Sequence, residues 1–191
     1  MYIDICLLTP EFWSAKVRSL TLDTLSDSEA RLLLSLGNDN VNKIWEELLP
    51  NEAKLDESAD REKRMRWIKL KYLARKYLSI TEADDEETKN RELYEASRNA
   101  QPMAVATALA QGADVEWKND EEGGNTALHA CAVSRRPADG SDWLGIECAE
   151  LLFQNGASMT VLNHSAHNVL DCAVIGNGDR EMIEYLSSKF E

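Results

Sequence analysis

The stretch that decides the fold lies in the second half of the chain, where residues 111–114 read QGAD and residues 155–158 read NGAS. Each tetrad follows an apolar, helix-forming stretch, at residues 104–110 in the first case and 149–153 in the second. The string TALHAC stands between them, at residues 126–131. Self-similarity of this kind indicates a repeat architecture, in which each unit buries its apolar face against the next unit.

TALHAC is close to the T-P-L-H-x-A signature that opens an ankyrin repeat, and a weaker version, NVLDCA, occupies residues 168–173. Gly112 and Gly156 are 44 residues apart, whereas the ankyrin period is about 33. An insertion around residues 136–142, RPADGSD, has turn composition and accounts for the excess. The sequence therefore predicts about three ankyrin units over residues 92–191, one of them complete.

The charge of the chain is large and uneven. The formal net charge is −13, but residues 61–76, REKRMRWIKLKYLARK, carry eight basic side chains and one acidic, which leaves −20 on the remainder. An acidic chain is a poor general nucleic-acid binder, so we expect no nucleic-acid partner. The basic segment fits an acidic partner, an anionic lipid surface or the acidic linker of the same chain. The alternative is a solvated helix whose Met65, Ile68, Tyr72 and Leu73 pack inward.

The first half predicts mainly helices. Residues 17–23 alternate apolar and polar side chains and form the only good strand candidate. Ser26 and Glu29 have the spacing of a capping box, and the helix that follows ends at Gly37. A second helix, capped by Asn38 or Asp39, should end at Pro50, and a long basic one should run over residues 61–78. Residues 81–91 are expected to form an acidic linker.

Three strings carry a more specific resemblance: KVRSLTLD at residues 16–23, LGN with VNKIWE at 36–38 and 41–46, and WIKLKY at 67–72. In this order they resemble the C-terminal two thirds of an Arf GTPase-activating (Arf-GAP) domain. Residues 93–96 and 108–117 resemble the ankyrin region of the subgroup that combines a coiled coil, a pleckstrin-homology (PH) domain, the Arf-GAP domain and ankyrin repeats. The resemblance implies a mainly α fold: a remnant of the Arf-GAP domain, with a short strand and about three helices, then a short ankyrin array.

The resemblance also implies what the N-terminus should contain. In that family four cysteines in a CxxC…CxxC arrangement hold a structural zinc, and an arginine after the last cysteine reaches the nucleotide site of Arf. The register puts the arginine near Leu8 and the last cysteine near Ile3, and neither matches. We therefore expect residues 1–15 to lie outside the family, residues 16–80 to be the C-terminal part of an N-terminally truncated Arf-GAP domain, and the zinc finger and catalytic arginine to be missing.

Few residues stand out as site candidates. The four cysteines, Cys6, Cys131, Cys148 and Cys172, form no CxxC pair, so no metal, cofactor or catalytic residue is assigned. The resemblance implies a GTPase-facing surface, with Arg18, Asp23 and Asn38 as candidates and a structural ion pair or solvated edge as the alternative. Trp117 and Trp143 are protein-binding candidates, since ankyrin arrays bind proteins through their loops and first helices, with local packing as the alternative. In the same context His129 is expected to hydrogen-bond between adjacent repeats.

Two functions remain open. The first is a GTPase activator of the Arf family, a regulator of membrane traffic that is not itself an enzyme, with impaired catalysis in this chain. The second is an ankyrin scaffold that binds proteins without activating a GTPase. The expected partners are an Arf-type GTPase, by resemblance, and other proteins through the repeats. No transmembrane segment is expected. The expected location is cytoplasmic, and peripheral at endosomal membranes for full-length family members.

Overall fold

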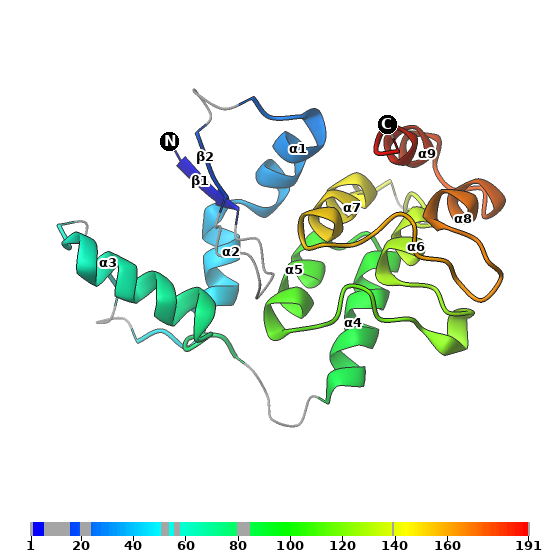
Figure 1. Cartoon of the computed structure of the whole chain (residues 1–191). Coiled ribbons are helices and arrows are strands. Elements are labelled where there is room, and N and C mark those ends of the chain that lie inside the picture. The colour runs from blue at the N-terminus through cyan, green and yellow to red at the C-terminus, as the bar shows by residue number, and fades with distance from the viewer. Residues whose placement is uncertain are drawn as a thin grey trace.

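The computed structural model describes residues 2–5, 16–19, 24–50, 54–55, 58–79, 85–138 and 140–190, the first two ranges at the level of the backbone. The described chain is mainly helical, as the sequence predicts, with a front region at residues 24–79 and an array of paired helices at residues 85–190 (Figure 1). Within the described part, the helices are too short and too polar to cross a bilayer.

The array consists of three stacked helix pairs in the described residues. The first helices of the pairs lie side by side in one layer, and the second helices form another (Figure 1). In chain order the helices are α4 (Glu86–Arg98), α5 (Pro102–Gln111), α6 (Ala127–Ala132), α7 (Gly145–Gln154), α8 (Val169–Ile175) and α9 (Arg180–Ser188). This is the stacking expected of about three ankyrin units, and its core is one continuous apolar cluster.

The repeated tetrads turn the chain at the end of the second helix in the first two pairs. Gly112 has φ +100° and Gly156 has φ +95°, a left-handed conformation that glycine adopts without strain. In each tetrad the N–H of the next alanine donates to a carbonyl of the preceding helix at 3.0 Å. Glu116 of the first unit then accepts from the N–H of Ser158 in the second, at 2.7 Å. The tetrads therefore end equivalent helices and tie consecutive units together.

The TALHAC signature begins a helix, as the sequence predicts. The Thr126 N–H donates to Nδ1 of His129 at 3.2 Å, and His129 Nε2 lies 3.4 Å from the carbonyl of His167 in the next unit. His129 is 1% exposed, and burial lowers its pKa, which favours a neutral ring that accepts at one nitrogen and donates at the other. The predicted structural role of His129 is confirmed.

The front region contains one strand more than the sequence predicts. β1 (Tyr2–Ile5) pairs antiparallel with β2 (Lys16–Ser19), with Ile3 opposite Arg18. The expectation of a single strand was wrong, because four residues are too few for an alternating pattern to be distinguished. α1 (Asp27–Leu36) begins with the predicted capping box at Ser26 and Glu29. α2 (Asn38–Trp45) follows at once, with Gly37 rather than Asn38 in the capping position.

The predicted basic helix is shorter and faces differently than expected. α3 (Arg61–Ile68) passes into one π-helical turn, η2 (Lys69–Leu73). Met65, Ile68 and Leu73, predicted to pack inward, are 47%, 46% and 53% exposed, whereas Lys71 is buried. Lys71 Nζ contacts Glu46 at 2.5 Å and Asn42 at 2.6 Å. Of the four side chains predicted to face inward, Tyr72 does pack on the body, against Trp45.

The front region rests on the second-helix layer of the array. α1 packs against α7 and α5, and α2 packs against α5. Leu32 and Trp45 of the front region belong to the same buried cluster as Val105 and Leu152 of the array. α4 begins at Glu86, inside the segment predicted as linker, because Asp85 caps it by accepting from the Thr88 N–H at 2.7 Å.

Candidate functional site: an interregion ion network and an open groove

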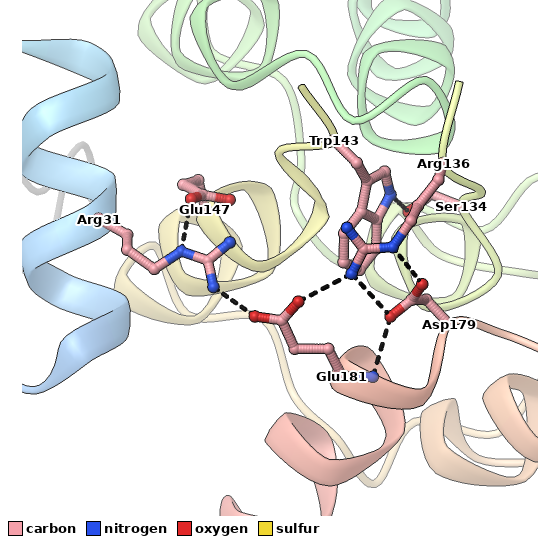
Figure 2. A network of polar contacts seen from close by, with 7 residues as sticks. All are labelled: Arg31, Ser134, Arg136, Trp143, Glu147, Asp179 and Glu181. Atoms are coloured by element: carbon pink, nitrogen blue, oxygen red, sulfur yellow. Dashed lines mark hydrogen bonds and ion pairs between the residues drawn. The ribbon is translucent and has the colours of Figure 1, made fainter. Parts of the chain in front are cut away.

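Two arginines converge on Glu181 where the front region meets the array (Figure 2). Arg31 of α1 donates from Nε to Glu147 of α7 at 2.8 Å and from Nη1 to Glu181 of α9 at 2.5 Å. Arg136, from the loop between α6 and α7, donates to the other oxygen of Glu181 at 2.9 Å and to Asp179 at 2.7 Å. Hydrogen bonds from the arginines, Arg31 first, lower the pKa of Glu181. The network links the front region to two repeats.

Glu150 of α7 is a second polar centre at this junction. It is 4% exposed, and its Oε2 accepts from Ser28 of α1 at 2.8 Å, from Tyr185 at 2.7 Å and from Lys189 at 3.0 Å. Burial alone would raise the pKa of Glu150, but these hydrogen bonds, together with one from Gln154, bring it below its ordinary value. Glu150 is therefore a buried carboxylate stabilised by donors from α1, α7 and α9.

Sequence reasoning missed this junction. Arg31 and Glu147 are 116 residues apart, and Ser28 and Glu150 are 122 apart. Neither pair belongs to a local motif. The one available signal was composition, because Glu147 and Glu150 are acidic residues inside an otherwise apolar helix, GIECAELLFQ. Charged residues are rarely buried without a partner, so this helix could have indicated a basic or hydroxyl partner, although not which one.

The two tryptophans named from the sequence differ in environment. Trp143 is 5% exposed, its Nε1–H donates to Ser134 Oγ at 3.1 Å, and the Arg136 guanidinium lies 4.7 Å from the ring centre (Figure 2). A side chain enclosed in this way is not available to a partner, so the protein-binding prediction for Trp143 is corrected to a packing role. Trp143 fastens the long α6–α7 loop to the array.

Trp117 lies in a groove of about 460 Å³ formed by the first loop of the array and the start of α4. It is half-buried, so part of the indole is open to solvent. Four of the nine lining residues are acidic and two are basic, and Arg91 bridges Glu87 and Glu121 at 3.1 and 2.6 Å. The acidic lining residues are Glu86, Glu87, Asp120 and Glu121. An aromatic face with an acidic rim suits a partner that carries basic or apolar side chains.

The three GTPase-facing candidates are not brought together in the described residues. Arg18 lies in β2, opposite Ile3, and its side chain is not among those described. Asp23 lies outside the described residues. Asn38 is the first residue of α2 and is partly exposed. Their contact with a GTPase stays a prediction.

The two buried cysteines of the array are poor zinc ligands. Cys131 and Cys148 are buried in the array, where burial raises both pKa values, that of Cys131 to about 12, so that a metal-binding thiolate is unfavourable. Cys131 Sγ donates to the Gly145 carbonyl at 3.3 Å instead. Cys6 lies outside the described residues. In the described part, no three His, Cys, Asp or Glu residues are grouped to hold a metal ion.

Comparison with known families assigns both regions. Residues 11–81 match the family described as putative GTPase-activating protein for Arf, and residues 123–164 match the ankyrin repeat. The chain therefore carries an Arf-GAP region followed by an ankyrin-repeat region. The match begins at residue 11, whereas the prediction began at residue 16, and the domain boundaries stay predictions.

Proteins similar to this chain include two whose names carry both features. The chain is 33% identical over 107 residues to Arf-GAP with coiled-coil, ANK repeat and PH domain-containing protein 2 of Gallus gallus, over 52% of this chain and 14% of that protein. It is 39% identical over 66 residues to the corresponding protein 3 of Homo sapiens, over 34% of this chain and 8% of that protein. It is 30% identical over 146 residues to Protein csx2 of Schizosaccharomyces pombe, over 76% of this chain and 14% of that protein. The chain thus spans a small part of each relative.

Proposed function

We propose that this chain is a regulatory segment for Arf-type GTPases that binds proteins through its repeats and has impaired ability to accelerate GTP hydrolysis. The observation that carries the proposal is the arrangement of the two regions. The Arf-GAP region packs on the second-helix layer of the array, while the groove at Trp117 lies between the first loop and α4. Both regions can therefore offer a surface to a partner at the same time.

The impairment part of the proposal rests on the sequence. An arginine inserted into a GTPase site stabilises the charge that develops on the transferring phosphoryl group, and it contributes about 10³- to 10⁵-fold in rate. In the family register the place of that arginine falls near Leu8, and the chain has no CxxC pair to hold the zinc. We assign this role neither to Arg18 nor to the arginines of α3.

Single-turnover GTP hydrolysis by an Arf protein tests this part. With the chain in excess, we expect less than about tenfold stimulation, because the largest contribution to the rate is missing. Stimulation above that level would contradict the impairment and restore the activator reading. Arg18→Ala and Asn38→Ala, each compared with the exposed control Lys54→Ala, would then identify the residues that act.

The alternative function is a protein-binding scaffold with no GTPase partner. It is favoured by the open groove at Trp117, which is independent of the Arf-GAP region. Direct binding to an Arf protein, measured by calorimetry with the GTP-bound and GDP-bound forms, separates the two. Binding supports the regulator, and its absence leaves the scaffold. We also propose a cytoplasmic location, and a peripheral position at endosomal membranes for the longer proteins.

A further inference from the structure

The helix α3 projects from the body of the protein and is held at one end. In the described chain its main packing partner is η2, which continues it (Figure 1). At that end Tyr72 packs edge-on against Trp45, with 5.1 Å between ring centres, and Trp67 stacks on Tyr77 at 5.2 Å. Lys71 adds its buried ion pair with Glu46. These contacts fix the direction of the helix, and we call residues 61–73 the α3 arm.

The α3 arm exposes apolar side chains on a very polar helix. None of the eight residues of α3 is buried. Met65 and Ile68, three residues apart and hence neighbours on one face, are 47% and 46% exposed, and Leu73 of η2 is 53% exposed. Tyr72 continues the stripe of Met65 and Ile68 down to the anchored end. In water these exposed apolar side chains gain no free energy from burial, so the stripe favours contact with a further surface.

Basic side chains surround these apolar ones. Arg61, Lys63, Arg66 and Lys69 are all exposed, and Glu62 is the single acidic residue of the arm. Residues 61–76 carry +7 in a chain of net charge −13. The rest of the protein therefore repels a negatively charged surface while the arm attracts it, which would orient the protein with the arm foremost.

The chemistry of the arm identifies the kind of surface. Long basic side chains reach phosphate groups while their stems cover apolar material, and apolar side chains between them enter the boundary between headgroups and acyl chains. A nucleic acid would use the charges but would gain nothing from Met65 and Ile68. We propose that the α3 arm is a peripheral docking element for anionic phospholipid membranes, with Met65 and Ile68 entering the interface.

Vesicle co-sedimentation of the full chain tests this proposal. We expect binding to vesicles of phosphatidylcholine with about 30% phosphatidylserine, little binding to phosphatidylcholine alone, and loss of binding at about 0.5 M NaCl, because the attraction is screened. No binding to the anionic vesicles at low salt would overturn the proposal. This outcome does not depend on the GTPase assay, so the two proposals can fail separately.

Two variants separate charge from apolar insertion. Arg61→Glu with Arg66→Glu should weaken vesicle binding at least about tenfold, because four units of charge are lost. Met65→Ser with Ile68→Ser should weaken it about fivefold while leaving the charge unchanged. Far-UV circular dichroism checks that each variant is folded, and the lipid and salt dependence of the unchanged protein needs no variant.

Matched controls come from the far end of the array. Arg135→Glu with Arg180→Glu changes the charge equally, and Val174→Ser with Ile175→Ser removes two side chains that are 55% and 62% exposed. Both should leave vesicle binding within about twofold, since neither pair lies on the arm. An equal loss in the controls would contradict a role specific to the arm. The arm would instead be assigned to nucleic acid if the protein bound a short DNA duplex but not vesicles, and if Met65→Ser with Ile68→Ser left the DNA binding unchanged.

Discussion

The front region and the array differ in where their helices find packing partners. In the array each helix packs against its partner in the pair and against the equivalent helix of the next unit, and all six residues of α6 are buried. In the front region α1 and α2 pack mainly on α5 and α7 of the array, and α3 packs mainly on η2. The array carries its own core, whereas the front region uses the array as a platform. The stability of the front region should therefore depend on the array, whereas the array should be stable without the front region.

The largest expected effect comes from the centre of the array. Leu128 of α6 is 1% exposed, and Leu128→Ala removes buried methyl groups and leaves a cavity, which costs about 2–5 kcal/mol. Because the front region rests on the array, both regions should unfold in one transition at lower denaturant concentration. Urea unfolding followed by circular dichroism measures this, with the 84% exposed Leu34→Ala as the control, which should shift stability by less than about 0.5 kcal/mol.

Leu32→Ala applies a similar change to the front region. Leu32 is 0% exposed on α1 and belongs to the shared core, so the local cost is again about 2–5 kcal/mol. Here the loss should stay local: hydrogen exchange in α1 and α2 accelerates while α4, α6 and α8 keep their protection. If exchange accelerated equally throughout, the two regions would be one cooperative unit and the comparison would be wrong.

Arg31→Ala tests the ionic part of the junction. Its removal leaves Glu147, whose side chain is 4% exposed, without its cationic partner, and the expected loss is about 1–3 kcal/mol. Hydrogen exchange in α1 should accelerate before that in the other helices. Arg180→Ala breaks an exposed pair with Glu184 one turn away and should leave the free energy of unfolding nearly unchanged. Equal effects of the two substitutions would mean that the network of Figure 2 does not hold α1.

Glu150→Gln should produce a smaller change that depends on pH. The folded-state pKa of Glu150 lies below the ordinary value of 4.5, so its contribution is fully present above pH 4.5 and is lost as pH falls through the folded pKa. Near pH 7 the substitution should cost about 1–2 kcal/mol, the loss of charge-assisted hydrogen bonds. Toward pH 4 and below, the difference between variant and unchanged protein should shrink. A constant difference across this range would contradict the assigned role.

The difference between local signals and contacts of distant residues explains what the sequence could predict. The tetrads, TALHAC and the capping boxes act over a few residues, so the paired helices, the role of His129 and the start of α1 were predictable. Trp143 was misassigned because composition does not reveal how the α6–α7 loop folds, which places Ser134 and Arg136 of the same loop against its ring. The orientation of the α3 arm depends on Lys71 finding Glu46, 25 residues away. The junction of Arg31 and Glu147 depends on tertiary contact alone.

The dependence of the front region on the array is tested most directly by separating them. Hydrogen exchange would be measured on residues 85–190 alone, on residues 1–84 alone and on the full chain. We expect the isolated array to keep the protection of α4 and α6, and the isolated residues 1–84 to lose the protection of α1 and α2. Full protection of α1 and α2 in the isolated residues 1–84 would contradict the account.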